Sequence, residues 1–301
     1  MRGMSRHKAM LRPLMNHFGV FILLALLAVG STVFAADAVG PDEPVIEGER
    51  LSAWLEQYER SIPVPENGGD PKMRARAEAA VRKLGTNAIP WLLFELSAKE
   101  PTQGDELPTN FHSGEAIRRR WTAATAFGIL GPSAKSVTTS VIPLLNDKQT
   151  SYTAATALGG LGVETIPVLI EALTNAHACA RESAARVLGL FGPKAQSAIP
   201  ALIRCAADKD DSVRAFATFS LGQIGREPAV VVPTLIANLQ DTSRSARWNA
   251  ACALGKFGDK AKIAIPALRQ VLRGADADVR EVATNALRQI DPEGAGKMGV
   301  K

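Results

Sequence analysis

The sequence predicts an all-α fold, a right-handed α-solenoid (superhelix) of about seven helical hairpins. One observation is a pattern that recurs every 33 residues, as Ile-Pro-x-Leu or Val-Pro-x-Leu beginning at Ile199, Val232 and Ile265. A second is the composition, with only 5% aromatic residues and abundant alanine, which suits close-packed helices better than a sheet. Recurrence at a period of 20 to 50 residues is typical of stacked repeats, so the period indicates a repeat architecture.

Residues 1–35 have the pattern of a secretory signal peptide. Four basic residues precede an apolar run from Phe18 to Val29, no acidic residue occurs in the segment, and small residues follow at Ala35 and Ala36, where cleavage is expected. As a helix the run would be about 18 Å long, short of the ~30 Å hydrocarbon core of a bilayer. The alternative is an uncleaved anchor, which would be the protein's only attachment to a membrane. Export predicts a periplasmic or extracellular location.

The basic character of the chain comes mostly from this segment. The formal charge is +5, but loss of residues 1–35 leaves 31 basic residues beside 30 acidic ones. A nearly neutral protein lacks the phosphate-neutralising surface that nucleic acids require, so no nucleic-acid partner is expected.

A flexible leader is predicted over residues 36–50, because it is rich in proline, glycine and acidic residues. Residues 51–58 then place apolar side chains at the spacing of an amphipathic helix. A second helix is expected to begin at Asp70 and Pro71, with the acid as N-cap, and to end at Gly85.

From there the repeat continues to residue 292, so the predicted solenoid spans residues 51–292. Residues at the same position of successive repeats are called a column, and three columns define the repeat. A glycine terminates the second helix of each unit, and Asp291 takes its place in the last. Alanine stands eight residues before each terminator, at Ala77, Ala123, Ala154, Ala184, Ala217, Ala250 and Ala283. A small residue or valine follows three residues later. Such columns let helices approach closely. Proline near the start of each first helix lacks an N–H that would be unpaired there.

Two units depart from the period. An insertion at 97–113 lengthens the second unit, and the first helix of a later unit is reduced to Ile142–Asn146. An insertion of this kind is expected to form a surface loop. The loop is either an insertion that the fold tolerates without a function or a loop with a functional role. Residues 293–301 form a C-terminal tail.

The three cysteines do not form a disulfide framework, since they are few, odd in number and in different phases of the repeat. One bridge, between Cys179 and Cys205, stays open as an alternative.

Residues 86–291 resemble the HEAT-repeat superfamily, in particular its phycocyanobilin-lyase HEAT-like repeats. The resemblance is carried by residues 192–202, by Asp211 to Arg214, and by Ala217, Leu221-Gly222 and Ile224-Gly225. Residues 47–55 resemble the lead-in of exported bacterial HEAT repeat domain-containing proteins. The resemblance implies HEAT-like hairpins used as a protein-binding scaffold.

The same superfamily contains enzymes, and their signatures are missing from this sequence. The iron-dependent hydroxylases of this fold have repeated His-Glu pairs, and no such dipeptide occurs here. After cleavage only His112 and His177 remain, without partners at metal-ligand spacing. We therefore expect no catalytic residues, no metal and no cofactor.

Two groups of residues remain as candidates. One arginine column contains Arg181, Arg214, Arg247 and Arg280, for which inter-repeat hydrogen bonding is favoured over a binding stripe. The other group is a predicted partner-binding cluster, which could instead fill the seam between repeats: Phe216, Phe219, Trp248 and Asn249.

The sequence thus predicts a non-catalytic scaffold that binds a protein partner on its concave face. The alternatives are an enzyme or enzyme accessory of bilin-lyase HEAT-like type, and a purely structural envelope protein.

Overall fold

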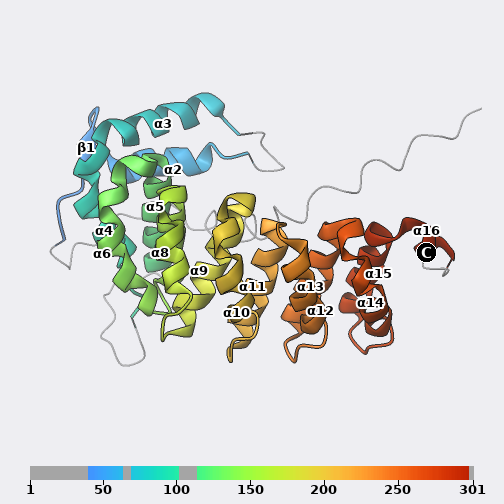
Figure 1. The fold of residues 1–301 in the computed structure, drawn as a ribbon. Helices are drawn as coiled ribbons and strands as arrows, with labels where there is room; N and C mark the ends of the chain where they lie inside the picture. The colour runs from blue at the N-terminus through green and yellow to red at the C-terminus, as the bar shows by residue number, and fades with distance from the viewer. Residues whose placement is uncertain (1–39, 64–68, 102–113, 298–301) are drawn as a thin grey trace, which may run out of the picture.

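The computed structural model of the protein describes residues 40–63, 69–101 and 114–297. These residues form a single row of helical hairpins, shown in Figure 1 from the N-terminal end in blue to the C-terminal end in red. The predicted signal segment 1–35, with its cleavage point at Ala35 and Ala36, and most of the insertion at 97–113 lie outside the described residues. Among the residues that are described, no helix combines the length and the apolar character needed to cross a membrane.

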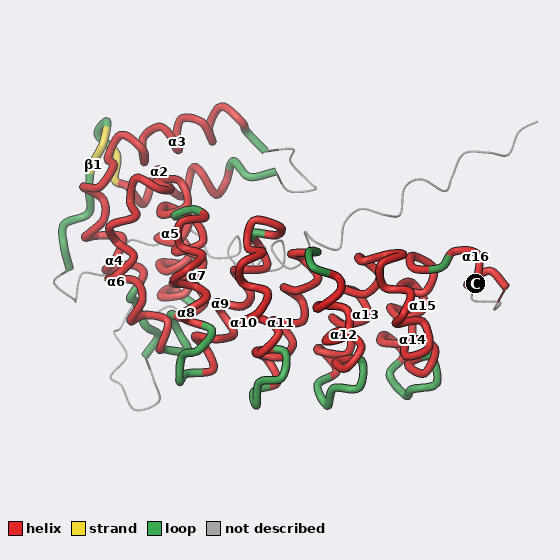
Figure 2. The backbone as a smooth tube through the Cα atoms, viewed as in Figure 1, coloured by secondary structure: helices red, strands yellow, loops and turns green. Residues whose placement is uncertain are grey.

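Seven helical pairs make up the row, as the periodicity predicts. The pairs are α2 (Leu51–Arg60) with α3 (Pro71–Leu84), α4 (Ile89–Leu96) with α5 (Glu115–Leu130), α6 (Thr138–Val141) with α7 (Ser151–Gly160), α8 (Ile166–Ala172) with α9 (Ala178–Leu190), α10 (Ile199–Cys205) with α11 (Asp211–Ile224), α12 (Pro228–Asn238) with α13 (Arg244–Phe257), and α14 (Ile265–Val271) with α15 (Ala277–Ile290). A last short helix, α16 (Pro292–Lys297), follows them. The predicted helical-repeat fold is confirmed (Figure 2).

Short 3-10 helices connect most pairs. A 3-10 helix inside the third pair, η3 (Ile142–Asn146), follows α6, and those between pairs are η1 (Gly85–Ala88), η2 (Gly131–Val137), η4 (Val163–Thr165), η5 (Gly192–Ala198) and η6 (Gly258–Ala264). The glycine before or at the start of each connection has a positive φ, as at Gly192 (55°) and Gly258 (56°). This conformation is unfavourable for residues with a Cβ, which explains the glycine column at the ends of the second helices.

The predicted helix starts follow the local rules with one exception. The Asp70 carboxylate accepts hydrogen bonds from the N–H groups of Lys72 and Met73, as an N-cap does. In α4, α8, α10 and α14 a proline occupies the first turn. In α12 the helix instead begins at Pro228, so Pro233 lies inside it. The prediction that Pro233 opens the helix was wrong, because Glu227 turns the chain in a left-handed conformation (φ 51°) and starts the helix earlier.

The predicted leader, residues 36–50, contains a two-stranded antiparallel hairpin instead of being flexible throughout. Its strands are β1 (Val45–Ile46) and β2 (Glu49–Arg50). The Trp54 indole N–H donates to the Ile46 carbonyl at 3.1 Å, and the Leu51 N–H donates to the Pro44 carbonyl at 2.9 Å. Burial of the Trp54 ring explains the order of this segment: Ile46, Trp54, Ala77 and Ala80 form a small core of their own.

The main core runs through the whole row between the first and second helices of the pairs. All seven members of the predicted alanine column are completely buried, Ala77 in the small core around Trp54 and the other six in the main core. The second helices of neighbouring pairs, such as α9 with α11 and α11 with α13, pack directly on one another, whereas the first helices of neighbouring pairs barely touch. Helices that pack more closely lie on the inner side of a curved row. The second helices therefore line the concave face.

Candidate partner-binding surface

The closest contacts along the concave face involve a glycine column that the sequence analysis did not use. It lies three residues before each terminator, at Gly128, Gly159, Gly189, Gly222 and Gly255. A Cβ on Gly189 would lie 2.5 Å from the Ser220 hydroxyl, and one on Gly222 would lie 2.5 Å from the Ala253 Cβ. A glycine of one second helix therefore packs against a small residue of the next second helix, and this contact sets the spacing of the two helices.

Both end helices break this column with arginine. Arg82 in α3 and Arg288 in α15 stand where the inner helices have glycine. In the part of the chain that the structure describes, α15 belongs to the last pair, so Arg288 lies at the end of the row. In α3 the arginine faces the next pair, and α3 packs on α5 over a much shorter stretch than α11 does on α13. The first pair is consequently splayed away from the row, above the second helices (Figure 1).

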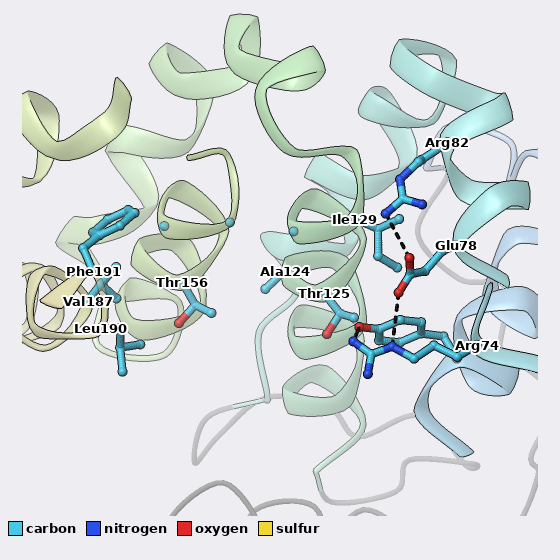
Figure 3. A pocket seen from close by; sticks show the side chains of 14 residues that line it. Arg74, Glu78, Arg82, Ala124, Thr125, Ile129, Thr156, Val187, Leu190 and Phe191 are labelled. Carbon is cyan, nitrogen blue, oxygen red and sulfur yellow. Dashed lines mark hydrogen bonds and ion pairs between the residues drawn. The ribbon is translucent and has the colours of Figure 1, made fainter. Parts of the chain in front are cut away.

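The splayed pair opens a groove of about 610 Å³ between α3 and the helices α5, α7 and α9. Figure 3 shows its two walls, with the charged side chains of α3 facing the uncharged residues of the other three helices. Besides Arg74, Glu78 and Arg82, the groove is lined by Tyr58, Ala124, Thr125, Gly128, Ile129, Thr156, Gly159, Gly160, Val187, Leu190 and Phe191. An open pocket with an apolar floor and a few converging polar groups is the usual form of a binding site.

The charged wall of the groove is held by hydrogen bonds within α3 and to α2. The Glu78 carboxylate accepts from Arg74 Nε at 3.1 Å and from an Arg82 terminal nitrogen at 2.9 Å. Arg74 also donates to the Tyr58 hydroxyl at 3.2 Å, and its guanidinium lies 5.3 Å from the Tyr58 ring centroid. Two cations thus share one carboxylate, and the wall carries a net positive charge.

A row of aromatic rings continues the concave face beside the groove. Trp121 of α5 and Tyr152 of α7 meet edge to face, with ring centroids 5.4 Å apart. The Arg186 guanidinium of α9 lies 4.0 Å from the Tyr152 centroid and 5.0 Å from the Phe216 centroid. These cation–π contacts link three neighbouring helices. Sequence reasoning missed Trp121 and Tyr152, although both stand one residue after the arginine column.

The four residues of the predicted partner-binding cluster lie on α11 and α13 of the same face. All four are partly exposed, and Phe216 and Trp248 also pack against the core. The Asn249 side-chain amide donates to the Ala215 carbonyl at 2.8 Å, so Asn249 ties α13 to α11. Phe219 shares a column with Thr125, Thr156 and Arg186, two of which line the groove. The groove and the cluster are therefore parts of one surface, and the binding role of the cluster stays a prediction.

The arginine column lies near the N-terminal ends of the second helices, where it joins neighbouring units. Arg181 donates to both Asp208 carboxylate oxygens at 2.8 Å, and Arg214 donates to those of Asp241 at 2.8 and 2.9 Å. Arg247 donates to Asp276 of the next unit, and Arg280 donates to backbone carbonyls of its own turn. These contacts are structural, and they leave little of the Arg181 or Arg214 side chains exposed.

The aspartates paired with these arginines make the free energy of unfolding depend on pH. Burial tends to raise the pKa of Asp241, but the hydrogen bonds from Arg214 and from the Ser243 N–H outweigh it and hold the pKa below its ordinary value. Asp208 has a lowered pKa for the same reasons, with Arg181 and the Asp210 N–H as donors. A carboxylate with a lowered folded-state pKa stabilises the fold above its unfolded pKa of about 3.9, and this stability is lost as the pH falls through the folded-state pKa.

We therefore expect the free energy of unfolding to fall as the pH is lowered below about 4, and Asp241→Asn to remove part of that dependence. Urea unfolding of both proteins at pH 7 and at pH 3 measures it. The variant should be clearly less stable than the wild type at pH 7, and the gap between the two proteins should be smaller at pH 3. An equal gap at the two pH values would contradict the assignment.

Among the described residues, the cysteines form no disulfide bond and no cluster of metal ligands occurs. Cys179, Cys205 and Cys252 are free thiols, and Cys179 and Cys205 each contact a different backbone carbonyl, of Leu145 and Leu173 respectively, at 3.6 Å. A Cys179–Cys205 bridge is thus not formed. Burial raises the pKa of the Cys252 thiol to about 11. Within the described ranges, no three His, Cys, Asp or Glu side chains cluster as metal ligands would. Of the two histidines that follow the predicted signal segment, His177 precedes α9 and His112 lies outside the described residues.

Comparison with known families and structures agrees with this architecture. A family model of HEAT repeats matches residues 138–217 and 199–288, which together make up half of the chain. None of the curated proteins compared with the sequence matches it.

Among solved structures, the chain is similar to the complex of CpcE and CpcF of phycocyanin lyase from Nostoc sp. PCC7120. The identity is 25%, with a TM-score of 0.45, over 50% of this chain and 98% of that one. It is also similar to the karyopherin Kap121p bound to the extreme C-terminus of the protein phosphatase Cdc14p, at 14% identity and a TM-score of 0.55. That match covers 83% of this chain and 31% of the karyopherin, so the chain spans about a third of its length. This second likeness is one of fold.

Proposed function

We propose, on the premise that this chain belongs to the HEAT-repeat family, that it is a non-catalytic scaffold which binds another protein along its concave face. The observation that carries the proposal is the continuity of that face. Thr125 and Thr156, which line the groove under α3, occupy the same repeat position as Arg186 and Phe219, and partly exposed aromatic rings lie on the same second helices. Partly exposed aromatic and arginine side chains supply most of the binding energy at protein interfaces.

The repeats support the same proposal from their energetics. Each pair contacts only its neighbours, so a row of seven pairs presents a long, rigid surface that other proteins can follow. Kap121p, which shares the fold at low identity, is described in complex with the C-terminus of another protein. In our proposal the present chain acts after export, in the periplasm or outside the cell, with residues 1–35 as its signal.

Site-specific photo-cross-linking in the native host tests the proposal. A benzoylphenylalanine at Phe219 places the cross-linker on the concave face, and one at Ile263, which is 72% exposed on η6, is the matched control away from it. We expect the Phe219 position to capture one dominant protein that the Ile263 position does not capture. Equal capture from both positions, or none from Phe219, would contradict the proposal.

A further inference from the structure

The groove under α3 is built from two walls of different chemistry. On the α3 wall, the Arg74 and Arg82 side chains are 45% and 58% exposed, whereas the Glu78 side chain between them is 21% exposed. The facing wall, formed by α5, α7 and α9, contributes only uncharged lining residues. A molecule that fills the groove therefore meets cations on one side and an uncharged, mostly apolar surface on the other.

The charged wall is suited to a carboxylate. A guanidinium has five N–H groups, and Glu78 accepts one from each arginine. The exposed edges of the two guanidinium groups can therefore donate to a second carboxylate in the charge-assisted geometry that arginine favours. Such a ligand would balance the net positive charge of the wall.

The uncharged wall is suited to a large apolar side chain. Leu190 is 64% exposed at the end of α9, beside Phe191 and opposite Ile129. Between them lie Gly159 and Gly160 of α7, and a Cβ on Gly160 would lie only 2.7 Å from the Gly128 Cα. The backbones of α5 and α7 thus meet closely at this part of the lining, and a partner's side chain that enters the groove can cover Leu190.

We infer that the groove takes an acidic, apolar segment of the partner protein, in which an Asp or Glu side chain pairs with Arg74 and Arg82 and a neighbouring large apolar side chain covers Leu190. The inference rests on the proposed function and assigns the partner's chemistry. A protein segment is favoured because the groove and the aromatic row share the helices α5 and α7, along which a bound chain can continue. A nucleic acid is disfavoured because Glu78 would repel phosphates and only one net positive charge would attract them.

Fluorescence anisotropy with the full chain and three labelled peptides of equal length tests the inference. In the first peptide glutamates flank leucines, in the second lysines replace the glutamates, and in the third serines replace the leucines. We expect the first to bind most tightly and to weaken with rising salt. Arg74→Gln/Arg82→Gln should weaken its binding roughly tenfold, and Leu190→Ser should weaken it by a factor of about five.

Two matched controls separate the groove from general effects on charge or surface. Arg288→Gln changes the same column at the far end of the row, and Ile263→Ser changes a more exposed aliphatic residue away from the groove. Neither should alter binding. Circular dichroism verifies that each variant folds. Because Leu190 is mostly exposed, Leu190→Ser keeps the test valid if the double arginine variant does not fold.

The inference would be overturned by equal or tighter binding of the lysine peptide, by the absence of binding of the first peptide, or by unchanged affinity in the groove variants. Its failure is distinguishable from failure of the scaffold function. If cross-linking from Phe219 persists unchanged in Arg74→Gln/Arg82→Gln, the scaffold stands and the groove assignment fails. If no partner is captured from Phe219 in the wild type, the scaffold proposal itself fails.

Discussion

Replacing Arg214 by alanine is expected to lower the free energy of unfolding by about 3 kcal/mol. The arginine joins two units, because it donates to both carboxylate oxygens of Asp241 and to the Asp208 carbonyl at 2.9 Å. The Arg214 and Asp241 side chains are only 12% and 9% exposed. Without the arginine, the Asp241 carboxylate would remain almost buried with most of its compensating charge removed. Urea unfolding followed by circular dichroism measures the effect.

Arg280→Ala is the matched control, at the same position of the last unit. Arg280 donates to the exposed carbonyls of Gly274 and Ala275, which water can satisfy, so its loss should change stability by less than about 1 kcal/mol. In a double-mutant cycle, Arg214→Ala and Asp241→Ala together should destabilise far less than the sum of the two single changes. Additive effects would show that the pair is not coupled.

Gly222→Ala and Gly128→Ala should change stability in opposite directions, although both glycines stand in the same column. At Gly222 the new Cβ would lie 2.5 Å from the Ala253 Cβ and 3.0 Å from its Cα, so the backbones of α11 and α13 must separate. Overpacking of this kind costs about 1–3 kcal/mol. The cost of overpacking exceeds the gain of roughly 0.5–1 kcal/mol from replacing glycine in a helix, and the expected net result is a loss of about 1 kcal/mol.

At Gly128 the nearest atom to a new Cβ is the Gly160 Cα, at 4.0 Å, an ordinary contact. Only the gain in helix propensity remains, so Gly128→Ala should stabilise the protein by roughly 0.5–1 kcal/mol. Urea unfolding of the two variants side by side measures both signs. Equal effects of the two changes would show that the glycine column does not set the spacing of the second helices.

Local rules made much of this fold predictable. The Asp70 cap and the glycines that end the second helices follow from conformational preferences that act within a few residues. The short first helix predicted at 142–146 is a 3-10 helix, η3, and α6 precedes it. The repeat itself was predictable because neither helix of a pair can bury its apolar face alone. The arginine column was also identifiable, since its spacing matches that of the alanines.

Other features depend on contacts between distant residues. The hairpin at 45–50 is ordered by the Trp54 side chain, which a composition rich in acid and proline does not reveal. Pro233 lies inside α12 because Glu227 adopts an unusual conformation. The partial burial of Phe216 and Trp248 follows from the positions of neighbouring helices, and a single helix face could not distinguish it from full exposure.

By itself the sequence determined the helical repeat, because periodic small and apolar residues allow one way of stacking hairpins. It also contained the decisive irregularity, arginine at position 82 where the inner helices have glycine. Only the tertiary structure decided the consequence of that irregularity. The spacing of two helices depends on the side chains that face each other across it, and Arg82 faces α5 across the groove only when the pairs are assembled. The groove under α3 is the result.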